Sequence, residues 1–381
     1  MRRELALRVL GELLGWSDTQ ATTEFRWLNL MSRLKFDGYQ DFLAGARFLE
    51  SLAAWLQQFA HSDERVAAYA FVRRNLIYLG EAETQHLVEI FYPEYVQPRL
   101  LRATAFQQGT PSHLVWASSS NAAAYDRLLR QTLFIGLSDG ARLDFLRRVN
   151  DGAISHEQIL PTIYVDPDKW QSALASLQED LRDAAARFQF LYLVDDFTAS
   201  GTTFLRKKNG QWKGKLERFR QNVRAHAHSH FDEDLQVCVH HHLASSRARR
   251  ALKQRHQEAV SDAEPKASWF SNIEFTFGSV LPDTVPLSRS AEESSEAFLD
   301  LARKYCDRKD PLFDNEHFKE GNTQDAALGF ADCALPLVLE HNTPNNSMAL
   351  LWAETPSSEE VARDPERHPM TALFRRRQRH V

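Results

Sequence analysis

Two adjacent carboxylates at the end of an apolar run are the residues best suited to chemistry in this sequence. The run Phe190–Val194 leads directly into Asp195 and Asp196, and a turn rich in hydroxyl groups, Thr198–Thr203, follows. Paired carboxylates accept hydrogen bonds from the neighbouring hydroxyls of a sugar, and they stabilise an anomeric carbon that becomes cationic. The pattern predicts binding of a phosphorylated sugar, with Asp195 and Asp196 as candidate catalytic residues.

The turn after the carboxylates is suited to holding a phosphate. Gly201 allows close approach to the backbone N–H groups, the hydroxyls add donors, and a helix starting there would add its positive end. We therefore expect the whole turn to bind the phosphate: Thr198, Ala199, Ser200, Gly201, Thr202 and Thr203. The alternative is a capped strand-to-helix turn without a ligand.

A second glycine-containing turn lies about 60 residues upstream. The apolar run Phe134–Leu137 is followed by Ser138, Asp139 and Gly140, and then by Arg142. Glycine permits backbone approach, and an arginine supplies a cation for a polyanion. These four residues are further candidates for ligand binding, with a simple connection between strand and helix as the alternative.

Amide side chains follow the last apolar run of the chain. Asn342, Asn345 and Asn346 come directly after 334–341, and their donors and acceptors suit the edge of a base or another polar group. They are candidate substrate-binding residues. Asn and Pro are also ordinary loop formers, so a purely structural loop is the alternative.

The elements that must position these residues alternate along most of the chain. Strand-like runs and helical stretches from about residue 111 onward predict a mostly parallel α/β sheet with flanking helices. Residues 1–110 are predicted to be helical, which divides the chain into 1–110 and 111–381. The predicted strands are 113–118, 132–137, 162–166, 188–196, 235–243, 273–281 and 334–341, and the predicted helices include 122–130, 142–149, 170–186, 215–227, 246–259 and 297–305.

The segment from Phe190 to Thr203 resembles the loop of type I phosphoribosyltransferases that binds 5-phosphoribosyl-1-pyrophosphate (PRPP). The resemblance implies that Asp195 and Asp196 hold the ribose hydroxyls and that Thr198–Thr203 wraps the 5-phosphate. It also implies that Ser138–Gly140 and Arg142 contact pyrophosphate. The expected ligand is PRPP or a nucleotide bearing ribose 5-phosphate, with Mg²⁺ as cofactor and reaction at the ribose C1.

Four segments together resemble a narrower group, the phosphoribosyltransferase-like proteins of bacterial conflict systems. They are GLSDGAR, VDDFTASGTT, HNTPNNS and LFRRRQRH. This resemblance implies a role in defence against phage, with a retron RNA or DNA or another defence protein as partner. The chain departs from the ordinary enzymes in a polar stretch at 207–215 and in lacking a clear mobile loop. A sensor or regulator that binds nucleotide or RNA without turnover is therefore the second hypothesis.

Composition bounds these hypotheses. The chain has 381 residues, of which 43% are apolar, and a net charge of −5, which excludes wholesale disorder. Its three cysteines (Cys238, Cys306 and Cys333) suit neither a disulfide framework nor a zinc site, which favours a reducing cytoplasm. We find no apolar run long enough to cross a membrane.

Histidine and arginine clusters are weaker signals. The histidines at 226–230 and 240–242 have a feasible metal spacing, but a solvated helix and a strand end account for them better, so no protein-held metal site is expected. The basic runs 247–255 and 375–379 suit nucleic-acid phosphates or, equally simply, a solvated helix and a terminus.

Overall fold

The computed structural model forms two compact units. The first contains Met1–Glu83 and Asp283–Val381, and the second contains Thr84–Pro282. This division differs from the predicted one at residue 110. Apolar residues such as Phe91 and Leu100 belong to the second unit because they join a core cluster on its sheet. The structure describes residues 3–40, 42, 47–224, 227–263, 268–288, 293–306, 310–355 and 369–376.

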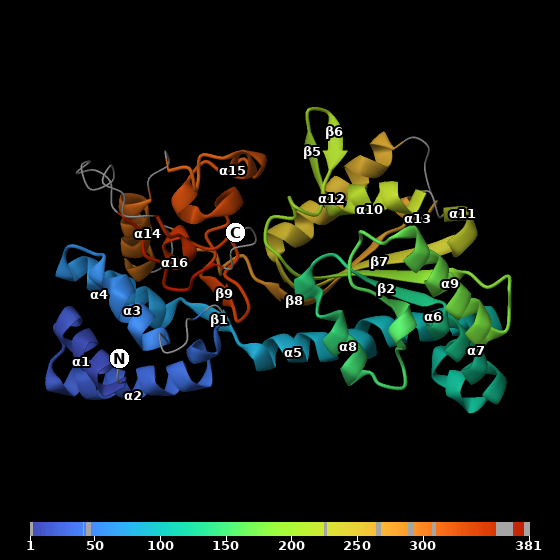
Figure 1. Ribbon diagram of the computed structural model, residues 1–381, viewed down its shortest axis with the longest axis horizontal. Helices are drawn as coiled ribbons and strands as arrows, with labels where there is room; N and C mark the ends of the chain where they lie inside the picture. The colour runs from blue at the N-terminus through green and yellow to red at the C-terminus, as the bar shows by residue number, and fades with distance from the viewer. Residues whose placement is uncertain are drawn as a thin grey trace. The chain divides into compact units, whose positions relative to one another are not determined.

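The second unit is built on a five-stranded parallel sheet (Figure 1). This confirms the predicted α/β class with a mostly parallel sheet. Four of the predicted strands are present, and their carboxyl ends lie at one edge because all strands run the same way. In spatial order the strands are β3 (Ile159–Leu160), β2 (Thr132–Gly136), β4 (Phe188–Thr198), β7 (Phe231–Ser245) and β8 (Glu274–Leu281).

Helices cover both faces of this sheet because its central strands carry apolar side chains on both faces. Leu191 and Leu193 of β4 face one cluster, and Tyr192 and Val194 face the other. The first cluster is completed by α9 (Pro167–Leu181), α10 (Lys215–Arg224), α12 (Ser246–Asp262) and α13 (Ser268–Ser271). The second is completed by α6 (Gln97–Gln108), α7 (Ser119–Arg130) and α8 (Leu143–Val149).

Three predicted strands differ from the structure. Residues 113–118 lie largely in a 3₁₀ helix, Ser112–Ala117, in which Leu114 and Trp116 are exposed and so lack the burial of a central strand. The segment 162–166 has no ladder and follows the short strand β3, because Pro161 and Pro167 flank it and proline cannot donate to a ladder.

The third, 334–341, is shortened to β9 (Leu337–Leu339). It pairs in parallel with β1 (Ile77–Leu79), a strand in the region predicted to be entirely helical, so the two form a small sheet within the first unit. Because β1 and β9 are far apart in the sequence, neither segment has a local residue pattern that indicates their pairing. Tyr78 and Leu339 are buried in this pair.

The first unit is otherwise mainly helical. Phe71 of α4 stacks on Phe298 of α14 with ring centroids 3.7 Å apart, which ties the amino-terminal helices to the carboxyl-terminal part of the chain. In the part of the chain that is described, no helix is long and apolar enough to cross a membrane. The α-helices of the first unit are α1 (Arg3–Leu14), α2 (Asp18–Leu34), α3 (Phe48–Gln57), α4 (Ser62–Arg74), α14 (Glu293–Tyr305), α15 (Glu316–Glu320) and α16 (Ala349–Trp352). Helix α5 (Glu81–Glu89) leads into the second unit.

Candidate functional site

The candidate site lies at the carboxyl edge of the sheet, where the two aspartates come two to three residues before the end of β4. Successive residues of a strand point to opposite faces, so Asp195 and Asp196 separate. Asp195 lies in register with His241 of β7 and is 3% exposed, whereas Asp196 is half-buried. The two carboxylates therefore have different surroundings.

Asp195 is held by two partners from different elements. The Ser138 hydroxyl donates to its Oδ1 at 2.5 Å, and the Lys215 ammonium, from the start of α10, lies 2.6 Å from its Oδ2. Burial raises the pKa of Asp195 above its usual range, while the charge of Lys215 opposes that rise. Lys215 therefore offsets part of the cost of burying this carboxylate.

Asp196 lies against the upstream glycine turn. Its Oδ1 accepts a hydrogen bond from the Phe197 N–H at 2.8 Å. A Cβ built on Gly140 would fall 2.2 Å from its Oδ2, so any side chain at position 140 would displace the carboxylate. The structure thus brings the turn Ser138–Gly140 and both aspartates together.

The expected phosphate loop is a closed turn with a left-handed glycine. Gly201 has φ +70°, and the Thr202 N–H donates to the Ser200 hydroxyl at 3.3 Å. Arg255 of α12 donates to the carbonyls of Ser200 and Leu205, and these two hydrogen bonds attach the loop to the helix. Ser245, the N-cap of α12, donates to the Ala199 carbonyl. Of the four hydroxyl residues, Thr198, Ser200 and Thr202 are buried and Thr203 is exposed.

The polar stretch after the loop folds as a side hairpin. Strands β5 (Arg206–Lys208) and β6 (Gln211–Lys213) pair with each other alone. The chain then returns at Gly214, whose φ of +122° lets its backbone pass the Phe204 carbonyl. The N–H groups of Lys215 and Leu216 donate to the carbonyls of Thr203 and Phe204. Helix α10 therefore begins against the loop despite the insertion.

The model of the PRTase-CE family matches residues 52–376. The chain belongs to the PRTase-CE family. It is a phosphoribosyltransferase-like protein, and its parallel sheet with flanking helices is consistent with a type I phosphoribosyltransferase-like fold. Neither the curated proteins nor the solved structures contain a match.

The edge of this PRTase-CE sheet also holds Lys215, which the sequence analysis did not single out, and two histidines that it treated as a weak signal. Lys215 was hidden in a stretch treated only as an insertion. His241 and His242 are completely or almost completely buried at the end of β7, and burial lowers the pKa of His241 to about 3 and that of His242 to about 4. Both rings are therefore neutral near pH 7. His242 Nε2 lies 3.3 Å from the carbonyl of Ala141, next to the predicted Arg142.

Arg142 takes a left-handed conformation with φ +51° immediately before α8. Such a backbone is uncommon for a residue with a side chain. The turn therefore changes direction at this residue, two positions after Gly140. The proposed contact between Arg142 and pyrophosphate stays a prediction.

The predicted asparagines belong to the first unit, whereas the aspartates belong to the second. Asn345 Nδ2 lies 2.7 Å from Nε2 of His317, and Asn346 donates to the Phe330 carbonyl at 3.0 Å. The Asn342 N–H closes a turn on Leu339. These bonds give the segment a structural role, and base recognition by it stays a prediction.

The candidate site fits a metal ion that is bound partly by a protein carboxylate and partly by the phosphates of a bound substrate. Among the described residues, no group of three or more His, Cys, Asp or Glu side chains could bind a metal ion, and His226 lies outside them. Mg²⁺ commonly uses one or two carboxylates, several waters and substrate phosphates. The half-buried carboxylate of Asp196 therefore fits Mg²⁺ carried by a diphosphate.

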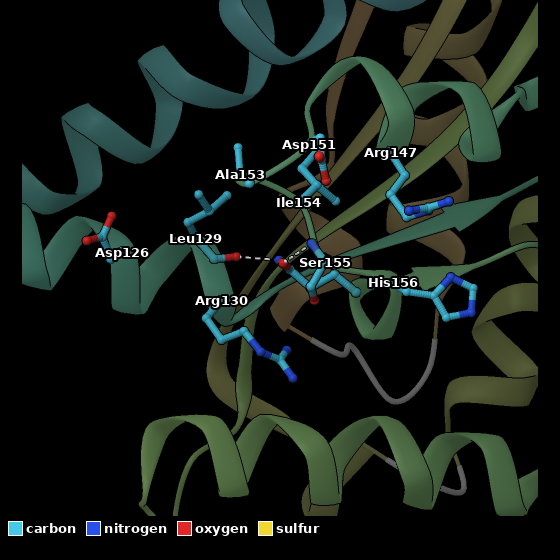
Figure 2. Close-up of a pocket in the computed structure, with 11 residues that line it drawn as sticks. Asp126, Leu129, Arg130, Arg147, Asp151, Ala153, Ile154, Ser155 and His156 are labelled. Carbon is cyan, nitrogen blue, oxygen red and sulfur yellow. Dashed lines mark hydrogen bonds between the residues drawn. The ribbon is translucent and has the colours of Figure 1, made fainter.

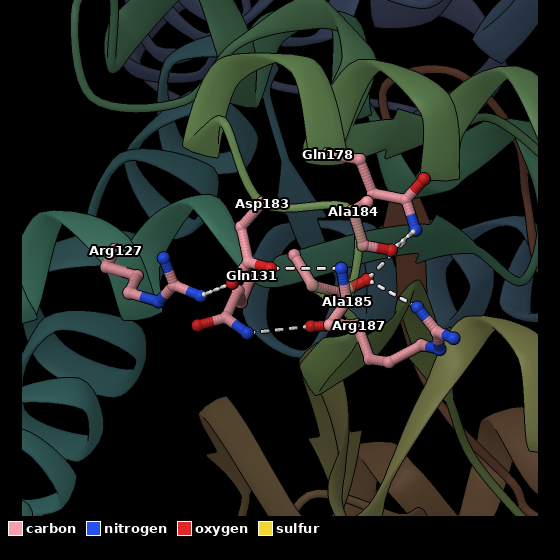
Figure 3. Close-up of polar contacts among 8 residues, drawn as sticks. Arg127, Gln131, Gln178, Asp183, Ala184, Ala185 and Arg187 are labelled. Atoms are coloured by element: carbon pink, nitrogen blue, oxygen red, sulfur yellow. Dashed lines mark hydrogen bonds and ion pairs between the residues drawn. The ribbon is translucent and has the colours of Figure 1, made fainter.

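The opposite edge of the sheet carries a different arrangement. A cavity of about 540 Å³ there is lined by charges of both signs, including Asp126, Arg147 and Asp151 (Figure 2). Nearby, ion pairs and hydrogen bonds join the end of α7 to the turn after α9, as between Arg127 and Asp183 (Figure 3). Mixed charge gives this cavity no preference for a phosphate, in contrast to the loop at the carboxyl edge.

Proposed function

We propose that the protein binds PRPP, or a nucleotide bearing ribose 5-phosphate, together with Mg²⁺, and acts at the ribose C1. The observation that carries this proposal is the contact of the Ser138–Gly140 turn with both aspartates beside the loop Thr198–Thr203. The membership in a phosphoribosyltransferase-like family supports it.

Each part of the site has a role in this proposal. The backbone and hydroxyl groups of Thr198–Thr203 bind the 5-phosphate. Asp196 accepts hydrogen bonds from the ribose hydroxyls and stabilises positive charge at C1. Ser138–Gly140 and Arg142 bind the diphosphate, whose departing charge Mg²⁺ would neutralise when bound. Lys215 favours the ionised form of the neighbouring Asp195.

A sensor that binds the same ligand without turnover is the second candidate. The ion pair between Lys215 and Asp195 favours it, because one of the two carboxylates already has a cationic partner. The basic hairpin β5–β6 would then contact a nucleic acid or a protein partner. For either function we propose a role in bacterial defence against phage, on the resemblance of the sequence to conflict-system proteins.

Calorimetric titration with PRPP and Mg²⁺ tests ligand binding. We expect Asp196→Asn to weaken PRPP binding about 10- to 100-fold, because a charged hydrogen-bond acceptor is lost. Asp151→Asn, an exposed change at the opposite edge of the same sheet, should leave the affinity unchanged. Equal affinity of the wild type and Asp196→Asn would refute the proposed site.

Release of pyrophosphate separates the two candidates. An enzyme should release pyrophosphate from PRPP when the right acceptor is added, and Asp196→Asn should slow the release. A sensor should bind PRPP with the same dependence on Asp196 and release no pyrophosphate with any nucleobase or nucleotide acceptor.

A further inference from the structure

Tyr164 presents a large aromatic ring to solvent. It follows β3 by four residues, so it lies beyond the carboxyl end of that strand. The residue is 59% exposed, whereas Ile163 before it is buried and Val165 after it packs on the core. An exposed ring between two anchored neighbours is held in place without being buried.

Helix α10 fixes the ring from the other side. Arg218 donates to the Tyr164 hydroxyl at 2.6 Å, and its guanidinium carbon lies 5.8 Å from the ring centroid. One turn further along, Asn222 donates to the Ile163 carbonyl at 3.2 Å. Two side chains of one helix thus tether this segment, and a tethered ring loses little entropy when a ligand stacks on it.

The same helix joins Tyr164 to the aspartates. Lys215 and Arg218 are three residues apart, so they lie on one side of α10. Lys215 contacts Asp195, and Arg218 contacts Tyr164. At the start of the segment, a Cβ on Gly136 would lie 2.5 Å from the Pro161 carbonyl, so the segment also passes the end of β2. Helix α10 therefore links Tyr164 to Asp195 through Arg218 and Lys215, and Pro161 links the segment to the end of β2.

We infer that Tyr164 forms a subsite for an aromatic nucleobase, with Arg218 as its positioning residue. This inference rests on the proposed function, since the base would be attached to, or transferred to, a ribose 5-phosphate held by Asp196 and Thr198–Thr203. A flat, exposed ring offers a stacking surface to any base, while a diphosphate would gain nothing from it. The subsite therefore adds affinity for nucleotides over a bare sugar phosphate.

Titration of the full-length protein with ribose 5-phosphate and with AMP, GMP, CMP and UMP, all with Mg²⁺, tests the subsite. Stacking on one ring predicts that at least one nucleotide binds about 5- to 150-fold more tightly than ribose 5-phosphate. Tyr164→Ala should abolish this margin and leave the affinity for ribose 5-phosphate unchanged. Tyr164→Phe should keep the margin, and Arg218→Ala should reduce it.

The matched control is Trp116→Ala, which removes another exposed aromatic ring of the same unit. It should change neither affinity. The subsite is wrong if the margin survives Tyr164→Ala, or if ribose 5-phosphate weakens equally with the nucleotides. If ribose 5-phosphate binds and no nucleotide binds more tightly, the subsite fails while the proposed function stands. If Asp196→Asn leaves ribose 5-phosphate binding unchanged, the proposed function itself fails.

Discussion

At the scale of single residues, Gly140 is the position where the smallest change should have the largest effect. A methyl group there would fall on the Asp196 carboxylate, which would have to move from its place beside the turn. We expect Gly140→Ala to weaken PRPP binding by about tenfold or more, as measured by calorimetry. Gly38→Ala is the control, because Gly38 has no atom within 4 Å of a built Cβ and no left-handed φ. Equal affinity of both variants would show that Asp196 tolerates displacement.

The residues of the site differ in how far the sequence could predict them. Asp195 and Asp196 follow an apolar run, and the turn after them has a recognisable order of hydroxyl and glycine residues, so local sequence suffices. Lys215 reaches Asp195 only because a hairpin returns the chain to the loop, and no local pattern encodes that return. His241 and His242 lie near the site through strand register, which the sequence does not specify by itself.

At the scale of elements, the hairpin β5–β6 should be separable from ligand binding. The hairpin contacts α12 at the surface, where Lys207 forms an ion pair with Asp262 and the Trp212 N–H donates to the same carboxylate. Exposed ion pairs of this kind add little to the stability of a protein. We expect replacement of Lys207–Lys213 by a short Gly-Ser turn to leave PRPP affinity intact and to shift the unfolding midpoint by less than about 2 °C. Loss of PRPP binding would show instead that α10 needs the hairpin to begin at the loop.

A second variant removes positive charge from the hairpin and keeps its strands, so it can be compared with the deletion. Lys208→Gln with Lys213→Gln retains both strands and the turn, and it should also bind PRPP normally. If the protein is a sensor that contacts nucleic acid through this hairpin, both variants should lose RNA binding, and the wild type should lose it at high salt. Normal RNA binding by both would remove the hairpin from that role.

Elements were predictable where burial on both faces imposes a continuous apolar run. Strands β2, β4 and β7 are such runs, and the helices between them show the matching apolar stripe. The run 113–118 was misleading because its apolar residues include Leu114 and Trp116, which the fold leaves exposed. The strand β1 was missed because it has only three residues, and its partner β9 lies in the distant carboxyl-terminal part of the chain.

At the scale of the whole molecule, the two compact units predict separable unfolding. Each has buried cores of its own, with Leu52 in the first unit and Leu177 in the second completely buried. We expect calorimetry to show two transitions. Leu52→Ala should lower one of them and Leu177→Ala the other, each by an amount that corresponds to about 2–5 kcal/mol of lost stability.

PRPP with Mg²⁺ identifies which transition contains the site. All residues that bind PRPP in the proposed function belong to Thr84–Pro282, so a ligand at about 100 times its dissociation constant should stabilise that unit by about 2.7 kcal/mol. For a unit of this size the shift is about 5–10 °C. It should raise the transition that Leu177→Ala lowers and leave the other in place. A shift of the transition lowered by Leu52→Ala, or of both together, would contradict the assignment of the whole PRPP site to Thr84–Pro282.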